Sequence, residues 1–243
     1  MARIELRDTI IRIKDGLSGT AAINDAGVMA TDTTFDINTI VLNSEDTDLI
    51  PVGARFTVAA ETGSPVHTVT ARTPASTSPT TNIEFTPALA AGVADMAVVT
   101  FLPQQVEVTV GEGNLTYTEN KEYEYLLDRG DLDTVREGNQ VPMDVSLDFV
   151  YEHVRTGTSE DITVVDAVKG IGGAVEWVSA SDDLCEPFCV DIEVEHTTPC
   201  GSVEDEITIF PMFRHDSLEF DLSAATISCQ GRCNATEPTI TRE

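Results

Sequence analysis

Basic residues are scarce in this chain of 243 residues. Lys and Arg number 14 against 42 Asp and Glu, which gives a formal net charge of −28 at pH 7. Binding to a nucleic-acid backbone needs clustered Lys and Arg side chains, so the composition argues against a protein that holds nucleic acid tightly. A high net charge of one sign also keeps proteins soluble by mutual repulsion, which is the simplest interpretation of the acidity.

Long apolar runs are also missing. No run approaches the ~20 residues that a membrane-spanning helix needs. The first segment, MARIELRDTIIRIKDG, alternates apolar and charged residues and lacks the apolar core of a signal peptide. We therefore expect synthesis in the cytosol and no membrane partner. Periodic Leu-rich or Ala-rich runs are few, whereas Thr, Val, Ile and Asp recur, and this composition favours β structure.

Recognisable catalytic patterns are absent as well. The four His residues show neither HExxH nor HxH spacing, and no G-x-S-x-G sequence occurs. Carboxylates are so numerous that no glycosidase pair stands out. The sequence therefore predicts a protein that is not an enzyme and that uses no cofactor and no metal.

Five cysteines in the last quarter of the chain leave three interpretations open. They are Cys185, Cys189, Cys200, Cys229 and Cys233. Four thiolates suit tetrahedral zinc, but the three-residue spacing within each local pair is unlike the usual two-residue zinc knuckle. Local disulfides, Cys185–Cys189 and Cys229–Cys233, are a second interpretation and need an oxidising environment. Free, partly buried thiols are the interpretation that we favour.

The most informative stretch is residues 112–152. Met143–Glu152 places Met, Val, Leu, Phe and Tyr at alternate positions, as in a strand with one buried face. Leu115–Leu127 carries Tyr117, Tyr123, Tyr125 and Leu127 on one parity, and the other parity carries Thr116, Thr118, Asn120, Glu122 and Glu124. The segment between them, DRGDLDTVREGNQVP, is charged and too long for a tight turn, so we expect a long, polar hairpin arm.

Short strand-like runs fill most of the remaining chain. Residues 35–100 are rich in Thr, Ala, Ser and Pro, with turn signals between short runs, and predict a small β-domain inserted into the main fold. Residues 1–34 and 101–243 then form the main β domain. One helix is expected before Gly170, capped by Thr158 or Ser159. Its predicted apolar stripe is Ile162, Val165 and Val168.

The segment EGNLTYTENKEYEYLLDRGDLDTVREGNQVPMDVSLDF resembles the centre of the tail tube (major tail) proteins of tailed bacteriophages. Those proteins have an EGNLT-type turn, LDRG, LDTVR and a PMDV-type return strand. RIELRDTIIRIKDG and the segments from Cys185 to Thr241 are similar to the same family. The resemblance implies a mainly β, tail-tube-like β-sandwich or barrel with one flanking α-helix. It also implies subunits that form stacked six-fold rings, and a tube through which viral DNA passes.

Three sets of contact residues are predicted. The arm is the predicted ring-to-ring contact: Asp128, Arg129, Asp131, Asp133, Arg136 and Glu137. Acids on inward strand faces are predicted to line the tube and to repel phosphates, so that DNA slides: Glu122, Glu124, Asp144 and Asp148. A basic N-terminal strand is predicted to contact an acidic neighbouring subunit, or else to be an edge strand guarded by charge: Arg3, Arg7, Arg12 and Lys14.

We therefore expect a structural virion protein, assembled in the host cytoplasm as a homohexamer and located in the viral tail. Its expected partners are itself and other tail proteins (a sheath if the tail contracts, a terminator, and baseplate or tip proteins). Viral DNA would pass without specific binding. The alternative is a secreted β-sandwich adhesion or carbohydrate-binding module, which explains the Thr-rich strands, the acidity and the cysteines. That alternative explains neither the charged arm nor the missing signal peptide.

Overall fold

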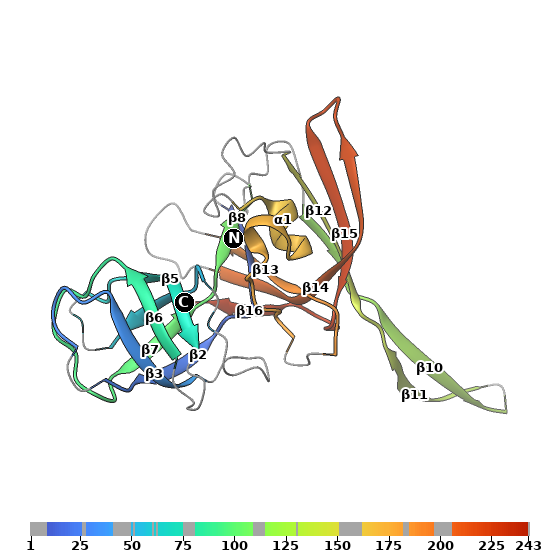
Figure 1. Cartoon of the computed structure of the whole chain (residues 1–243). Helices are drawn as coiled ribbons and strands as arrows, with labels where there is room; N and C mark the ends of the chain where they lie inside the picture. The colour runs from blue at the N-terminus through green and yellow to red at the C-terminus, as the bar shows by residue number, and fades with distance from the viewer. Residues whose placement is uncertain are drawn as a thin grey trace. The chain divides into compact units, whose positions relative to one another are not determined.

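The computed structural model is mainly β, with one short α-helix in its described part (Figure 1). It describes residues 9–25, 28–40, 50, 52–59, 61, 63–74, 81–108, 115–129, 131–150, 162–181, 185–196 and 206–242. The β-rich class predicted from composition is confirmed. The chain divides into two compact units. Unit 1 comprises Met1–Ile13, Glu107–Thr156 and Val190–Glu243, and unit 2 comprises Lys14–Val106 and Gly157–Cys189.

An eight-stranded sheet forms unit 1. Its order is β8-β1-β13-β14-β15-β12-β9, with β16 paired to β14. The strands are β1 Thr9–Lys14, β8 Gln105–Glu107, β9 Leu115–Thr118, β12 Met143–Val150, β13 Val190–His196, β14 Glu206–Asp221, β15 Thr226–Cys233 and β16 Thr239–Arg242. The predicted alternation in β12 is confirmed, because Met143, Val145, Leu147 and Phe149 are all buried.

Strand β14 joins two parts of this sheet. It is a single strand of 16 residues. Its first half pairs with β13 and β16, and its second half pairs with β15. The change of partner falls near Met212, whose φ is +50° and whose N–H donates to Asp191 Oδ1 over 2.8 Å. This local bend lets one strand serve both halves of the sheet.

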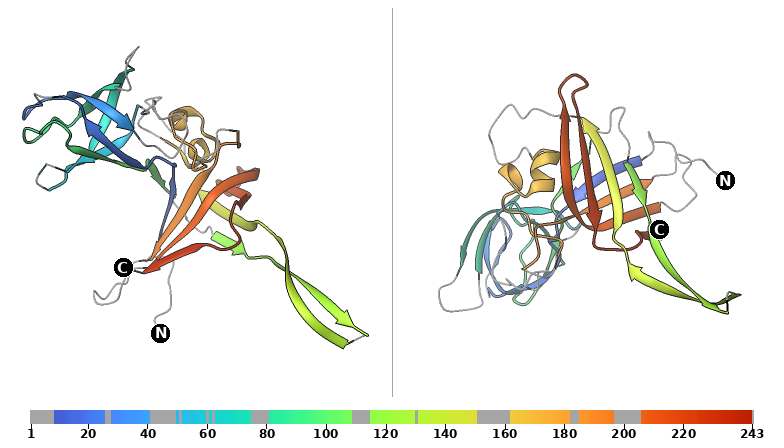
Figure 2. Two further views of the ribbon diagram at one scale, coloured as in Figure 1. Left: turned by 90° about the horizontal axis from the view of Figure 1, so that it is seen from below. Right: turned by 90° about the vertical axis from the view of Figure 1, so that its right-hand side faces the viewer.

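A closed six-stranded barrel forms most of unit 2 (Figure 2). Its order is β2-β3-β6-β5-β4-β7. The strands are β2 Gly19–Ile23, β3 Thr34–Ile40, β4 Arg55–Val58, β5 His67–Pro74, β6 Thr81–Thr86 and β7 Val98–Leu102. Its core holds Phe35, Phe56, Phe85 and Phe101, and the ring of Phe56 contacts each of the other three rings. Since β2 pairs with β7, the barrel begins before the predicted domain boundary at residue 35 and ends after the one at residue 100.

Asp15 connects three segments of unit 2 through hydrogen bonds. Its buried carboxylate accepts hydrogen bonds from the backbone N–H groups of Leu17, Gln104 and Val178, at 3.2, 2.8 and 3.4 Å. The N–H of the next residue, Gly16, donates to Val178 O over 2.9 Å. A Cβ atom at Gly16 would clash with the backbone of Ser179, so this close approach requires glycine.

Helix α1, Val164–Lys169, is short and capped at both ends. Thr163 Oγ1 accepts from Asp166 N–H over 3.1 Å, and Asp166 Oδ2 accepts from Thr163 N–H over 3.2 Å, which makes a capping box. The predicted end at Gly170 is confirmed, because this residue is the C-cap with φ +62°. A 3-10 turn, η2, follows at Gly172–Ala174. No helix in the described ranges has the length and apolarity to cross a membrane.

The start and the buried face of this helix differ from the prediction. The proposed caps Thr158 and Ser159 lie outside the described residues, and the helix begins after Thr163 because that residue and Asp166 cap each other. The predicted stripe is also shifted: the buried side chains are Val164, Ala167 and Val168. The helix and its flanking segments belong to unit 2 and not to the predicted 101–243 domain.

The four described cysteines hold neither of the local disulfides. Cys189 and Cys229 are buried free thiols, and Cys200 lies outside the described residues. Cys229 and Cys233 are four residues apart on β15, and a rise of ~3.3 Å per residue puts their Cα atoms ~13 Å apart, too far for a disulfide. Burial raises the pKa of Cys229 to about 12, so its thiol stays protonated at neutral pH.

Burial and this raised pKa predict an unreactive thiol at Cys229. In native protein at pH 8, iodoacetamide should alkylate the exposed Cys185 faster than Cys229 by more than about a hundredfold, because the thiolate is the nucleophile. Mass spectrometry of tryptic peptides measures both rates, and urea-unfolded protein is the control in which the two rates converge. Equal native rates would contradict the buried position of Cys229.

A histidine and a carboxylate are paired inside the barrel. His67 Nε2 lies 2.6 Å from Glu61 Oε2, and both side chains are fully buried. Since a carbonyl oxygen only accepts, His67 Nδ1 carries a proton and donates to Pro87 O over 2.7 Å. Glu61 Oε1 accepts from Ala90 N–H over 2.7 Å. The pair therefore fixes the loop after β6 to the barrel, and both ring nitrogens of His67 and both carboxylate oxygens of Glu61 have partners.

Replacing Glu61 with Ala should destabilise unit 2 by roughly 3 kcal/mol, because it leaves His67 Nε2 and Ala90 N–H buried without partners. Glu61→Gln is the matched control, since an amide can donate to one atom and accept from the other. Urea unfolding followed by the fluorescence of Trp177, the single tryptophan and a residue of unit 2, measures the difference. Equal stability of the two variants would refute this role.

Candidate interaction surface

Strands β10, Lys121–Asp128, and β11, Asp131–Gln140, form a two-stranded antiparallel sheet of their own. They belong to unit 1 and run beyond its eight-stranded sheet in Figure 1. Each described side chain is exposed except that of Leu126, which is half-buried. Arg129, at the turn, has φ +53°. The hairpin therefore shields almost none of its own side chains.

The register of this hairpin gathers its apolar side chains on one face. Tyr123, Tyr125 and Leu127 alternate along β10, and the residues opposite them on β11 are Glu137, Val135 and Leu132. We call the five apolar residues of this set the hairpin apolar face. Their exposed fractions are 48% for Tyr123, 60% for Tyr125, 63% for Leu127, 72% for Leu132 and 56% for Val135.

The opposite face of the hairpin is polar except for Leu126, which is half-buried. It carries Glu122 and Glu124 from β10, with Arg136 opposite Glu124 and Thr134 opposite Leu126. The hairpin is thus amphipathic, although no described element covers its apolar side. An isolated two-stranded hairpin is at best marginally stable in water, and a contiguous exposed apolar face marks an interaction site.

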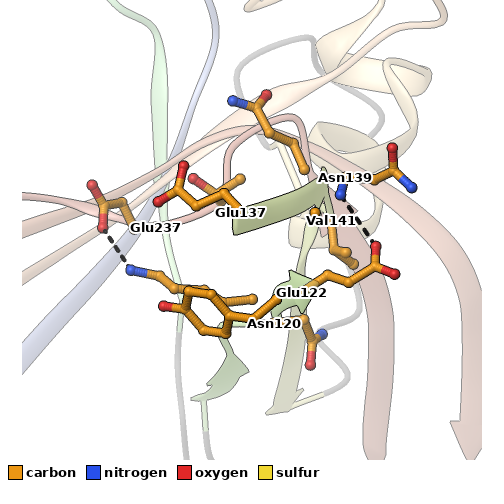
Figure 3. A pocket seen from close by; sticks show the side chains of 11 residues that line it. Asn120, Glu122, Glu137, Asn139, Val141 and Glu237 are labelled. Carbon is orange, nitrogen blue, oxygen red and sulfur yellow. Dashed lines mark hydrogen bonds and ion pairs between the residues drawn. The ribbon is translucent and has the colours of Figure 1, made fainter. Parts of the chain in front are cut away.

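The base of the hairpin is held by polar contacts around a pocket of about 200 Å³ (Figure 3). Lys121 Nζ lies 3.8 Å from Glu237 Oε2, and Asn139 N–H donates to Glu122 Oε2 over 3.2 Å. A Cβ at Gly138 would lie 2.8 Å from Glu122 Cγ, so glycine at this position leaves room for the Glu122 side chain to reach across to β11. The pocket is lined mainly by amides, carboxylates and backbone, which suits hydroxyl-bearing ligands or water.

Two of the predicted tube-lining residues share the polar face of the eight-stranded sheet. Asp144 and Asp148 lie on the same face of β12, opposite Arg232 and Ser228 of β15. Arg232 Nε donates to Asp144 Oδ1 over 3.1 Å and lies 3.8 Å from Asp216 Oδ2. The other two, Glu122 and Glu124, lie on the hairpin instead. The structure thus divides the predicted set between two sheets.

The predicted arm residues lie along this hairpin. Asp128, Arg129, Arg136 and Glu137 are exposed, whereas the side chains of Asp131 and Asp133 are outside the described part. The sequence interpretation missed the hairpin apolar face, because it gave the tyrosines to a half-buried strand. The available signal was that Tyr123, Tyr125 and Leu127 directly precede the charged arm, where a sheet is about to end.

The N-terminal cations find acidic partners within their own chain. Arg12 Nη1 donates to Glu195 and, over 3.2 Å, to Glu193. Burial acts to lower the pKa of Arg12, but the hydrogen bonds and charges of these carboxylates raise it overall, so the guanidinium stays charged. Strand β1 lies between β8 and β13, so the edge-strand alternative is wrong. The carboxylate partners of Arg12 lie on β13 of the same chain, and its predicted contact with a neighbouring subunit stays a prediction.

The other residues of the predicted N-terminal contact are Lys14, Arg3 and Arg7. Lys14 is half-buried at the end of β1, and Arg3 and Arg7 lie outside the described residues.

Within the described ranges, no three His, Cys, Asp or Glu side chains are grouped so as to hold a metal ion. Comparison of the chain with protein-family models, with curated proteins and with solved structures finds no match.

The exposure of the hairpin apolar face predicts that it tolerates charge in the isolated subunit. Tyr125→Lys should change the free energy of unfolding by less than about 1 kcal/mol, because the side chain loses only its cross-strand contact with Val135. Leu147→Lys, at a buried position of β12, is the contrasting variant and should prevent folding of the sheet. Urea unfolding followed by circular dichroism measures both. A large loss of stability for Tyr125→Lys would mean that this face is part of the core.

Proposed function

We propose that this chain is a tail tube subunit of a tailed bacteriophage, which polymerises as stacked hexameric rings into a hollow conduit for DNA. The observation that carries the proposal is the hairpin apolar face. Five large apolar side chains of one two-stranded sheet stand roughly half or more in water. Covering one such half-exposed side chain stabilises a complex by on the order of 1 kcal/mol. A surface of this kind therefore favours binding to a permanent partner.

A second copy of the chain is the partner that fits the sheet. Among the described strands of the eight-stranded sheet, β9 pairs with β12 alone and β8 pairs with β1 alone, so both ends of the strand order carry unpaired backbone groups. Repeated edge-to-edge pairing of identical sheets closes a ring, and a closed ring leaves no edge. We identify the β10–β11 hairpin with the projecting arm and assign it to ring-to-ring contact.

The charge of the chain suits passage of DNA without binding. At −28, an assembled tube repels phosphates unless cations line its inner wall. The polar face of the sheet carries Asp144 and Asp148, while Arg232, on the same face, is neutralised by Asp144 and Asp216. We assign this face to the inside of the tube. The other partners of such a subunit are the remaining tail proteins, and its location is the virion tail.

One observation favours a second candidate, a β-sandwich adhesion or carbohydrate-binding module. The pocket at the hairpin base offers Asn120, Asn139, Glu122 and Tyr123, and amides, carboxylates and aromatic rings are the groups that hold sugar hydroxyls. A glycan array with the purified protein distinguishes the two functions. Saturable binding of one sugar by a chain that remains monomeric favours the module over the tube.

The tube proposal predicts that wild-type protein polymerises and that the hairpin apolar face is required. Tyr125→Lys should abolish polymers in negative-stain electron microscopy and sedimentation velocity, because it places a charge in a contact that excludes water. Thr134→Lys adds the same charge to the polar face of the same hairpin and should leave polymerisation intact. Deletion of residues 129–139 should give a folded subunit that does not polymerise. Tubes of normal length from Tyr125→Lys or from the deletion would refute the assignment.

A further inference from the structure

One side of the unit 2 barrel carries no carboxylate. Strand β7 lies between β2 and β4 in the closed barrel, and none of these three strands contains Asp or Glu. Strands β3 and β6 of the same barrel, in contrast, carry Asp36 and Glu84. In a chain with 42 acidic residues, a side without carboxylates is where another acidic surface meets the least repulsion.

The outward side chains on this side of the barrel are mostly small. They alternate with buried core residues along each strand, and cross-strand pairs such as Ala22–Val98 and Thr57–Thr100 bring them together. Val98 is 44% exposed. Short side chains let a second sheet approach closely. We call the following seven residues the barrel face: Thr20, Ala22, Arg55, Thr57, Val98, Thr100 and Leu102.

Arg55 is the one charged residue of the barrel face. Its side chain is half-buried between Leu102 and Thr68 of the neighbouring strands, and it has no ion-pair partner among the described residues. Four other arginines each have a carboxylate partner in the same chain, namely Arg12, Arg72, Arg232 and Arg242. A guanidinium without a carboxylate beside it can therefore pair with one from another molecule.

The hairpin apolar face has the complementary arrangement. Glu137 lies opposite Tyr123 in the hairpin register, so its carboxylate stands beside the apolar side chains of that face. Glu137 is exposed and has no ion-pair partner within the described ranges. Residues 121–140 together contain six carboxylates and three cations. The hairpin is thus acidic as a whole and is best matched by a surface that has a cation and no carboxylate.

We propose that the hairpin apolar face of one copy packs on the barrel face of a second copy, with Glu137 of the first paired to Arg55 of the second. This inference rests on the proposed function, and it names the surface that the arm meets. The contact is heterologous, because two different surfaces of the chain meet. It leaves one hairpin and one barrel face unused in every pair, so it propagates into larger assemblies.

Exchange of the two charges tests this pairing directly. Arg55→Glu places two carboxylates in the contact, and Glu137→Arg places two guanidinium groups there. In sedimentation velocity, each single variant should need a concentration roughly tenfold or more above that of the wild type to polymerise, because like charges repel where water is excluded. The double variant has the composition of the wild type and opposite charges in the contact, so it should polymerise as the wild type does.

A mixture of the two single variants shows whether the contact joins different copies. Each hairpin can then meet a barrel face of opposite charge on the other variant, so an equimolar mixture should also polymerise near the wild-type concentration. Polymers from the double variant but not from the mixture would place the pair within one chain and would overturn the proposed contact between copies.

Controls keep the outcome specific to the barrel face. Thr73→Glu adds a carboxylate at an exposed position of β5, outside the barrel face, and should polymerise like the wild type. Circular dichroism should show that every variant is folded. If Arg55→Glu is not, Val98→Glu replaces it, because Val98 is exposed, and Glu137→Arg should relieve its defect.

The remaining outcomes separate this contact from the tube itself. Wild-type polymerisation by both single variants, or a double variant as defective as either of them, would overturn the contact between hairpin and barrel face and leave the tube proposal standing. A wild type that never self-associates would instead remove the proposed function, and this contact with it.

Discussion

The constraint on which the account depends is that the β10–β11 hairpin has an apolar face and no core of its own. Alternation fixes Tyr123, Tyr125 and Leu127 on one side, and the register with β11 adds Val135 and Leu132 to the same side. A two-stranded sheet has no second layer to cover that side. In the proposed tube a second copy of the chain supplies that layer, and the acidity of the chain restricts which other molecules approach closely.

The rest of unit 1 places that hairpin and limits its freedom. Strand β9 leads into β10 and β11 leads into β12, and Pro142, which has no N–H to donate to a ladder, lies between β11 and β12. Asn120 Nδ2 donates to Asp144 Oδ2 over 3.0 Å, and the ion pair of Lys121 with Glu237 holds the other side of the base. Strand β14 is shared by both halves of the sheet.

Local pattern in the sequence was enough to predict some of these features. Period two in Met143–Val150 identified β12 and its buried face, and Gly170 identified the end of the helix. The partners of Arg12 were not predictable in this way, since Glu193 and Glu195 are 181 and 183 residues away. The closure of the barrel by β2 and β7 is likewise a long-range pairing, which no local turn signal at residues 35 or 100 encodes.

The hairpin apolar face shows a different limit of sequence reasoning. Alternation tells which side chains share a face, but it does not tell whether another layer covers them. The most direct test of the account is therefore hydroxyl-radical footprinting of Tyr123 and Tyr125 in dilute and in concentrated wild-type protein, with Met96 of unit 2, 60% exposed, as reference. The account predicts that both tyrosines are modified in the monomer and lose that reactivity, relative to Met96, as the chain polymerises. Polymers in which both tyrosines stay fully reactive would contradict it.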